Sequence, residues 1–226
     1  VMSVRNLKVS FNTEAGRVDA VRGVNFDLWG GRTLGIVGES GSGKSVTALS
    51  LIGLLDDNAH VTGSIKLGDE ELLGKTDEEM SKLRGTRISM IFQDPLSALT
   101  PMFTIGDQLA EALLTHNPHM PKTDVHNRCL ELLEIVGITN PEERLDAYPH
   151  EFSGGMRQRV VIAIAIANNP DIIIADEPTT ALDVTIQAQI LDVLKVAQKE
   201  TGAAVVLITH DLGVVAGTAD DIMVMY

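Results

Sequence analysis

The sequence predicts an α/β fold in which helices cover a mostly parallel sheet. Apolar, β-branched strands such as residues 171–175 and 205–209 alternate with helical patterns in the C-terminal part, as in parallel sheets buried on both faces. Near the N-terminus, residues 7–11 and 24–28 alternate between apolar and polar instead, which is the period of a strand with one solvated face. We therefore expect an N-terminal antiparallel β subdomain next to the parallel core.

The other elements follow from local signals along the chain. Residues 33–37 form a short apolar strand that leads into a glycine-rich loop, and a helix is expected over residues 45–55. Further strands are expected at residues 63–67 and 87–92. The remaining expected helices cover residues 105–114, 125–136, 155–167 and 186–197.

Residues 94–153 differ from the rest of the chain because they contain helical patterns and no convincing strand. Prolines at positions 118, 121 and 141 break these patterns. We interpret residues 94–153 as an inserted α-helical subdomain. Residues 1–93 and 154–226 then form the core and the β subdomain of a single domain.

Composition limits the class of protein. The 226 residues are enough for one large domain with a sizeable core. No apolar stretch approaches the roughly 18 residues that span a bilayer, and no secretory signal is visible, so we expect a cytosolic location. The net charge of −13 argues against general nucleic-acid binding. A single cysteine, Cys129, excludes an internal disulfide.

Both ends of the chain look truncated. Val1 begins inside a stretch that reads as a strand, and Tyr226 follows the apolar residues 222–225. We therefore expect the chain to be a fragment of a longer protein.

Residues 38–45 read GESGSGKS and match the phosphate-loop pattern G-x-x-x-x-G-K-[ST]. A glycine turn between strand and helix leaves backbone N–H groups free for phosphate oxygens, and the helix dipole adds to the attraction. Lys44 is expected to reach the β- and γ-phosphates, and the Ser45 hydroxyl to ligate Mg²⁺. The residues predicted to cradle the nucleotide are Gly38, Ser40, Gly41, Ser42, Gly43, Lys44 and Ser45. An ordinary glycine turn is disfavoured because a strand precedes the loop and a helix follows it.

Two carboxylates end the apolar strand at residues 172–176. Asp176 should point out of the carboxyl edge of the sheet, where ligands bind in open α/β folds, and should hold Mg²⁺ directly or through water. Glu177 is then placed to orient or deprotonate an attacking water. Acidic capping of a strand is the alternative, and the preceding phosphate loop disfavours it.

Gln93 and His210 also follow strands. His210 should emerge at the same sheet edge beside Asp211 and could donate a hydrogen bond to the γ-phosphate. The Gln93 amide could touch Mg²⁺ or the water and report the nucleotide state to the helical subdomain. Structural roles are the alternative for both.

Ser153, Gly154 and Gly155 open the helix at residues 155–167. A serine cap and free N–H groups make a second anion site at a helix N-terminus, although simple capping would give the same pattern. Two γ-phosphate sites in one chain suggest that the second serves the nucleotide of another subunit.

Together these motifs resemble the nucleotide-binding subunits of ATP-binding cassette (ABC) transporters. The resemblance covers nearly all 226 residues. Its motifs, in chain order, are the phosphate loop at residues 38–45, the Q-loop Gln93, the signature at residues 153–155, the Walker B strand at residues 172–176 with Glu177, the D-loop at residues 181–183 and the switch His210.

The resemblance implies a P-loop NTPase (RecA-like) core and a head-to-tail dimer that sandwiches two ATP molecules with Mg²⁺. Each nucleotide would lie between Lys44 of one subunit and Ser153 and Gly155 of the other. Glu177 would be the general base and His210 the γ-phosphate sensor, with catalytic support from Lys44 and Gln93. Asp183 would couple the two sites.

An aromatic residue before the phosphate loop stacks on adenine in this family. Phe11 is the candidate here, and its alternative is a buried strand residue.

Within the family, residues 38–47, 91–95 and 149–159 resemble the dipeptide, oligopeptide and nickel importers. Phe152 and Met156 stand where the common signature has leucine and glutamine, as they often do in that branch. The cysteine-rich C-terminal extension of the branch is absent from this sequence.

The resemblance implies an ATPase subunit that powers uptake of peptides or a related small solute. It would lie on the cytoplasmic side of the membrane and dock on transmembrane permease subunits through residues 95–108. An identical or related second cassette would complete the dimer, and an extracytoplasmic solute-binding protein would act indirectly. The alternative is a non-transport ABC ATPase acting on nucleic acid or ribosomes, which would usually carry a basic surface or tandem cassettes. A regulatory module that binds ATP without hydrolysis is disfavoured because Glu177 and His210 are present.

Overall fold

The computed structural model describes residues 1–180 and 182–226, with every side chain in these ranges except that of Leu96. The described chain forms two compact units. Unit 1 comprises Val1–Arg84 and Ala204–Tyr226, and unit 2 comprises Gly85–Ala203.

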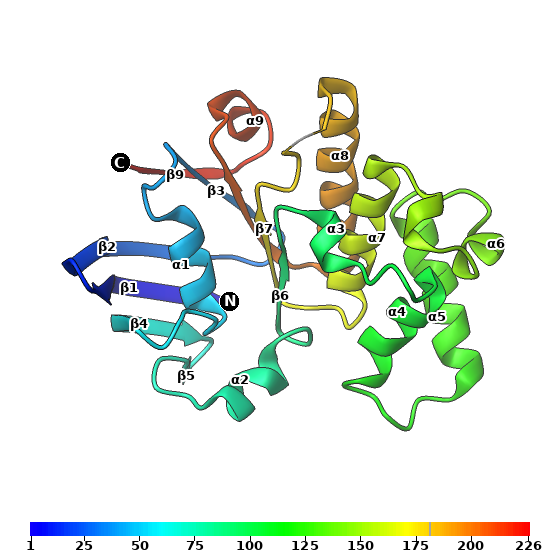
Figure 1. The fold of residues 1–226 in the computed structure, drawn as a ribbon, viewed down its shortest axis with the longest axis horizontal. Helices are drawn as coiled ribbons and strands as arrows, with labels where there is room; N and C mark the ends of the chain where they lie inside the picture. The colour runs from blue at the N-terminus through cyan, green and yellow to red at the C-terminus, as the bar shows by residue number, and fades with distance from the viewer. Residues whose placement is uncertain (181) are drawn as a thin grey trace. The chain divides into compact units, whose positions relative to one another are not determined.

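An antiparallel sheet forms the N-terminal part of unit 1, as the alternating pattern predicted. Its strands are β1 (Met2–Thr13), β2 (Gly16–Leu28), β4 (Ala59–Leu67) and β5 (Glu70–Glu71), in the order β2-β1-β4-β5 (Figure 1). Buried side chains such as Leu7, Val9 and Ile65 supply its core face. Strand β4 begins four residues earlier than predicted.

Parallel strands form the second sheet region of unit 1. Strand β3 (Thr33–Gly38) lies between β8 (Ala204–Thr209) and β9 (Asp221–Met225), and both pairings are parallel. The short helix α9 (Leu212–Ala216) connects β8 to β9. The prediction missed α9 and β9, because residues 222–225 were interpreted only as the end of a fragment.

Helix α1 (Lys44–Leu51) follows the glycine-rich loop and is shorter than the predicted 45–55. Gly53 has a φ of 63°. Its N–H donates to the Ser50 carbonyl, and the Leu54 N–H donates to that of Leu49. These two bonds form a Schellman motif, which ends a helix at a left-handed residue.

Helix α2 (Asp77–Leu83) in unit 1 was not predicted, although the sequence carries its start signal. The Thr76 hydroxyl accepts from the Glu79 N–H, and the Glu79 carboxylate accepts from the Thr76 N–H. This reciprocal pair is a capping box.

Unit 2 contains the parallel strand pair β6 (Ile88–Ile91) and β7 (Ile172–Asp176). Helix α7 (Gly154–Ile166) precedes β7, and α8 (Val184–Thr201) follows it. The two helices pack together. The predicted strands and helices of this region are confirmed to within four residues at each end.

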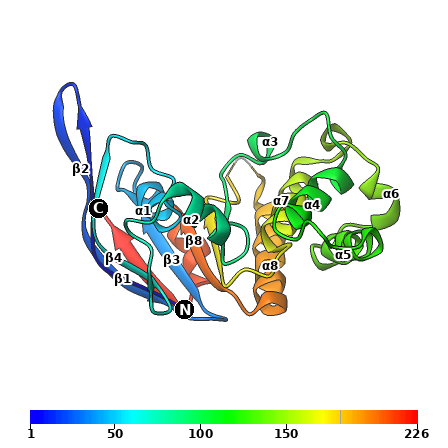
Figure 2. The same ribbon diagram turned by 90° about the horizontal axis from the view of Figure 1, so that it is seen from below.

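Residues 94–153 of unit 2 contain helices and loops and no strand, as predicted. The helices are α3 (Pro95–Ala98), α4 (Ile105–Leu114), α5 (Lys122–Ile135), α6 (Pro141–Leu145) and a short 3₁₀ helix, η1 (Pro149–Glu151). Helices α4, α5 and α6 contact one another (Figure 2). The exact limits of a separate helical subdomain remain a prediction, because unit 2 also includes β6, β7, α7 and α8.

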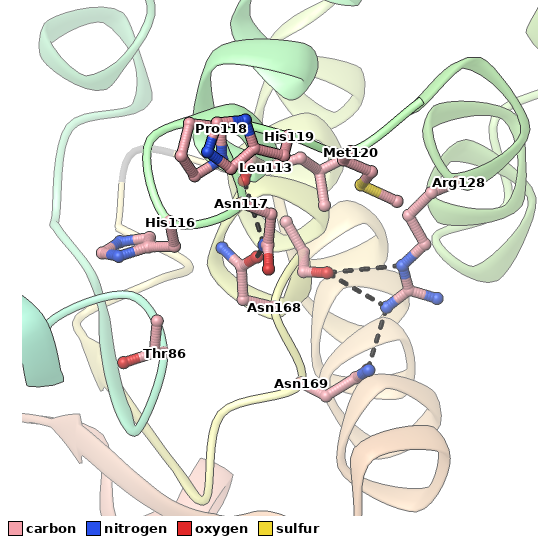
Figure 3. A pocket seen from close by; sticks show the side chains of 11 residues that line it. Thr86, Leu113, His116, Asn117, Pro118, His119, Met120, Arg128, Asn168 and Asn169 are labelled. Atoms are coloured by element: carbon pink, nitrogen blue, oxygen red, sulfur yellow. Dashed lines mark hydrogen bonds between the residues drawn. The ribbon is translucent and has the colours of Figure 1, made fainter. Parts of the chain in front are cut away.

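The helical part of unit 2 is tied together at the C-terminal ends of α4 and α7. The Arg128 guanidinium donates to the Ala167 carbonyl and to the Asn169 side chain, and Asn117 donates to Asn168. These groups line a cavity of about 740 Å³ (Figure 3). Arg128 therefore satisfies carbonyls that the last turn of α7 leaves open.

Among residues 1–180 and 182–226, no helix combines the length and apolar character that crossing a membrane requires.

Candidate functional site

The phosphate loop of unit 1 connects β3 to α1 through tightly packed glycines. Gly43 is the N-cap of α1 with a φ of 92°. A Cβ at Gly43 would lie 2.5 Å from the Ala20 carbonyl oxygen, and one at Gly38 would lie 2.2 Å from that of Met225. The loop conformation therefore requires glycine at both positions.

Polar groups of the loop are arranged for an anion. Lys44 is 6% exposed, and its ammonium donates to the carbonyls of Gly38 and Glu39 at 2.7 and 2.8 Å. The buried Ser42 hydroxyl has no hydrogen-bond partner in the described part of the chain. Ser40, Gly41 and Ser45 are exposed at the surface of the loop. A cradle with an unpaired hydroxyl and a lysine held against the loop fits a bound phosphate chain.

His210 lies at the same sheet edge as the phosphate loop. Val37 pairs with Thr209 in the parallel β3–β8 ladder, so Gly38 and His210 each follow one member of this pair. The His210 side chain is exposed. Asp211 is occupied as the cap of α9, because its carboxylate accepts from the N–H groups of Gly213 and Val214.

The acidic residues in unit 2 lie at the end of β7. Asp176 is the last residue of the strand and is 9% exposed. Glu177 follows with a φ of 48°, a left-handed conformation that is uncommon outside glycine. Such strain recurs at functional sites, where surrounding structure holds the residue in place.

Gln93 and Glu177 meet in unit 2. Ile91 pairs with Ala175 in the parallel β6–β7 ladder, so the segments that follow both strands leave at one edge. The Gln93 Nε2 lies 3.4 Å from the Glu177 Oε2. The Thr180 hydroxyl donates to the same carboxylate oxygen at 2.8 Å. Sequence reasoning missed Thr180, whose only signal was its position three residues after Glu177.

The signature residues begin α7. The Ser153 hydroxyl caps the helix by accepting from the Met156 N–H at 3.3 Å. A Cβ at Gly155 would lie 2.9 Å from the Ile186 side chain of α8, so α7 and α8 approach closely at this glycine. Ser153 and Gly154 are exposed, which leaves the helix N-terminus open to a ligand.

Two arginines that sequence reasoning did not single out support the signature. Arg157 donates to the Pro149 carbonyl at 2.8 Å, and the Arg144 guanidinium lies 5.4 Å from the centre of the Phe152 ring. Phe152 is buried. These contacts hold the segment before Ser153 against α6 and α7.

Asp183 and Phe11 have clear structural surroundings. The exposed Asp183 caps α8 by accepting from the Ile186 N–H at 3.0 Å; its D-loop neighbour Ala181 lies outside the described residues. Phe11 is half-buried in β1, opposite Val18 on β2 and Ala59 on β4. The adenine contact of Phe11 and the coupling role of Asp183 stay predictions.

The structure thus gathers the predicted site residues into two sets. Unit 1 holds the phosphate loop, Lys44 and His210 at one sheet edge. Unit 2 holds Gln93, Asp176 and Glu177 where β6 and β7 end. It also holds Ser153 and Asp183, which are the N-caps of the adjacent helices α7 and α8. One set is suited to phosphate binding, and the other to metal binding and proton transfer.

Comparison with known sequences places this geometry in a family context. Residues 21–180 match the ABC transporter family model. The chain is 59% identical to the dipeptide transport ATP-binding protein DppD of Bacillus subtilis, over an alignment that covers all of this chain and 68% of that protein. It is 56% identical to the oligopeptide transport ATP-binding protein OppD of Mycobacterium tuberculosis. That alignment covers all of this chain, which spans 37% of the mycobacterial protein.

Solved structures show the same fold. A dimer of the ATP-binding cassette MJ0796 in a post-hydrolysis state, bound to ADP and Pi, matches with a TM-score of 0.85 and 30% identity. The match covers 100% of this chain and 94% of that one. CbiO1 from Clostridium perfringens, part of the ABC transporter complex cbiONQ, matches with a TM-score of 0.80 and 27% identity, covering 98% of this chain and 85% of that one.

Proposed function

This chain belongs to the ABC transporter family, and from that membership we propose that it binds and hydrolyses ATP to power an importer of peptides or a related small solute. The observation that carries the proposal is its 59% identity, over its full length, to a dipeptide transport ATP-binding protein. The exposed phosphate loop and the Glu177 carboxylate supply the two chemical parts that such a subunit needs.

Unit 1 binds the triphosphate. Lys44 exchanges its bonds to the Gly38 and Glu39 carbonyls for phosphate oxygens, and the loop N–H groups and the Ser42 hydroxyl add hydrogen bonds. The exposed Ser45 hydroxyl, the Asp176 carboxylate and the Gln93 amide are oxygen donors of the kind that Mg²⁺ prefers. When bound, Mg²⁺ neutralises charge on the β- and γ-phosphates.

Glu177 accepts the proton of the attacking water. The Gln93 amide and the Thr180 hydroxyl fix one of its carboxylate oxygens, which orients the base. His210 stabilises the γ-phosphate from the strand end next to the phosphate loop. Because phosphoryl transfer depends mainly on position and charge, the positions of these side chains support the proposed hydrolysis.

A second cassette completes each site. Ser153, Gly154 and Gly155 present the open N-terminus of α7, and Asp183 begins the helix packed beside it. In the proposed head-to-tail dimer, this face covers the nucleotide held by Lys44 of the partner. The partner cassette is an identical or a related chain.

The dimer works at the cytoplasmic side of a membrane as a peripheral subunit. Residues 95–108 dock on transmembrane permease subunits, and the exposed Met102 and Phe103 in this segment offer apolar contacts. An extracytoplasmic solute-binding protein delivers the solute to the permease. The net charge of −13 and the transport names of the relatives favour this function over nucleic-acid or ribosome binding.

The decisive experiment is affinity purification of the full-length protein from its native membrane, followed by identification of bound proteins. Permease subunits of the peptide or nickel type, with a second cassette, are the expected result. Ribosomes or nucleic acid without a membrane protein would contradict the transport function and leave only the ATPase chemistry.

A further inference from the structure

One buried side chain of α7 is not explained by packing. Gln158 is 1% exposed, and within residues 1–180 and 182–226 its amide nitrogen and oxygen both lack a hydrogen-bond partner. Burying an amide without a partner costs stability. The other buried residues of α7 are apolar, namely Val160, Val161, Ile162, Ala163, Ala165 and Ile166. An apolar residue would therefore pack better at position 158, and the amide points to a function beyond packing.

Gln108 shows what a buried glutamine does elsewhere in unit 2. It lies on α4 and is 8% exposed. Its Oε1 accepts from the Thr100 N–H at 2.8 Å. Its Nε2 donates to the carbonyls of Thr100 and Phe103, both at 3.0 Å. One amide thus clamps the backbone of a neighbouring segment through both its donor and its acceptor. Gln158 has the same two groups, and neither is used within the described chain.

The position of Gln158 on α7 indicates which segment its amide faces. Gln158 follows Gly154 by four residues, so the two lie on the same face of the helix. A Cβ at Gly154 would lie 3.6 Å from the Leu182 side chain, which places this face against the segment between β7 and α8. Because long side chains on a helix point back toward its N-terminus, the Gln158 amide is directed at that segment.

The β7–α8 segment, described at residues 177–180 and 182, carries the proposed base. The Thr180 N–H donates to the Glu177 carbonyl at 3.2 Å, and the Leu182 N–H donates to the Thr179 carbonyl at 3.3 Å. Both distances are at or beyond the long end of the usual range of about 2.7–3.2 Å. Glu177 also has a φ of 48°, a conformation that the surrounding structure must hold. A clamp on this backbone would therefore act on the position of the base.

We propose that Gln158 is a positioning residue for ATP hydrolysis. With ATP bound, its amide donates to and accepts from the backbone of the β7–α8 segment, as the Gln108 amide does at Thr100. An interaction made only when Glu177 is in its working position favours that position over others. This inference rests on the proposed hydrolysis by Glu177.

Gln158→Met removes the amide and keeps the approximate length of the side chain. In the full-length protein we expect it to lower kcat for ATP hydrolysis by roughly 10- to 100-fold, as misplaced catalytic groups do. Affinity for a fluorescent ATP analogue should be unchanged, because the phosphate loop lies in unit 1. Parent-like kcat in a folded Gln158→Met variant would overturn the proposal.

Ile162→Met is the matched control for repacking. Ile162 is fully buried on the same face of α7, four residues after Gln158, and carries no polar group. This variant should hydrolyse ATP like the parent. A loss of kcat equal to that of Gln158→Met would show that packing of α7, and not the amide, matters, and would overturn the proposal.

Stability separates a clamp from a structural contact. Gln108→Met removes an amide whose partners are present in the structure, so it should lower the midpoint of urea unfolding. Gln158→Met should not lower it. Loss of turnover without loss of stability is therefore the expected result for Gln158. An equal fall of the midpoint in both variants would make Gln158 a structural residue and overturn the proposal.

Hydrogen exchange measures the clamp without turnover. In a Glu177→Gln background, ATP should slow amide exchange several-fold in the peptide that spans the β7–α8 segment. Adding Gln158→Met should remove most of this slowing while ATP stays bound, and adding Ile162→Met should not. Equal slowing with and without the Gln158 amide, or no slowing by bound ATP, would overturn the proposal.

The same measurements distinguish this inference from the proposed function. If the parent neither binds nor hydrolyses ATP, the proposed function fails and the role of Gln158 fails with it. If the parent and Gln158→Met bind and hydrolyse ATP equally well, only the role of Gln158 is overturned.

Discussion

The two sets of site residues differ in what holds them in place. In unit 1 the backbone defines the phosphate loop: Gly43 has a φ of 92°, and Lys44 bonds to two loop carbonyls. In unit 2 side chains hold the site residue in place, since Gln93 and Thr180 both contact the Glu177 carboxylate. The chemistry of unit 2 should therefore change with a single side-chain replacement that leaves the fold intact, whereas the loop of unit 1 should not tolerate added side chains.

The largest effect is expected for Glu177→Gln in unit 2. Removing the base should lower ATP turnover by about 10³-fold, within the range of general-base catalysis, while the phosphate loop keeps its ATP affinity and the ATP-bound dimer accumulates. Phosphate release and ATP binding, measured on the same sample, check this. Turnover equal to that of the parent would show that Glu177 is not the base.

Lys44→Ala tests the other region and should affect binding. The loss of hydrogen bonds from a charged donor should weaken ATP affinity by roughly 10- to 100-fold. Equilibrium binding of a fluorescent ATP analogue measures it. Lys8→Ala on the exposed face of β1 is the matched control and should bind like the parent. Unchanged affinity in Lys44→Ala would contradict the role of the loop.

Arg128→Ala should destabilise unit 2 through its helix ends. The variant leaves the Ala167 carbonyl and Asn169 side chain without their donor, which should lower the free energy of unfolding by about 2 kcal/mol. Urea unfolding measures the change. Arg17→Ala, which removes an exposed ion pair with Asp19 in unit 1, should cost less than about 0.5 kcal/mol. An equal decrease in the free energy of unfolding for both variants would mean that the Arg128 hydrogen bonds stabilise unit 2 no more than an exposed ion pair does.

Gln158→Met should stabilise unit 2 or leave its stability unchanged. Gln158 is 1% exposed, and neither atom of its amide has a hydrogen-bond partner in the described residues. Replacing the amide with a side chain of similar length removes a desolvation penalty of about 1 kcal/mol or more. A fall in the midpoint of urea unfolding would indicate a partner such as a buried water.

The smallest expected effect is the contribution of Glu71 to the loss of stability at acidic pH. Burial alone would raise the pKa of Glu71, but hydrogen bonds from the Ser64 hydroxyl and the Ile65 and Leu73 N–H groups outweigh it and hold the pKa below its ordinary value of 4.5. The unfolded chain binds this proton more readily, so the contribution to stability is present above pH 4.5 and is lost as pH falls through the folded-state pKa.

Glu71→Gln should therefore weaken the dependence of stability on pH in this acidic window, by well under about 1 kcal/mol in total. Urea midpoints of parent and variant, measured from pH 6 to pH 3, provide the check. Parallel pH profiles would show that Glu71 does not titrate differently on folding.

Sequence patterns predicted the strands and helices that are specified by residues close together in the chain. The apolar alternation predicted the N-terminal antiparallel strands, and helix α4 was predicted with the boundaries that it has. The prediction was wrong at the end of α1, where the Schellman bonds at Gly53 stop the helix. It missed α2 despite its capping box and also β9, whose pairing with β3 involves residues far apart in the chain.

The sequence by itself determined the kind of chemistry, because a phosphate loop, a strand ending in Asp176 and Glu177, and a serine-capped helix are each defined over a few consecutive residues. Tertiary structure alone decided the partners of these groups. Thr180 and Gln93 meet the Glu177 carboxylate, and Gly38 ends β3, which pairs with the strand that His210 follows. Strand register and helix packing set such contacts, and both depend on residues that are distant in sequence and close only after folding.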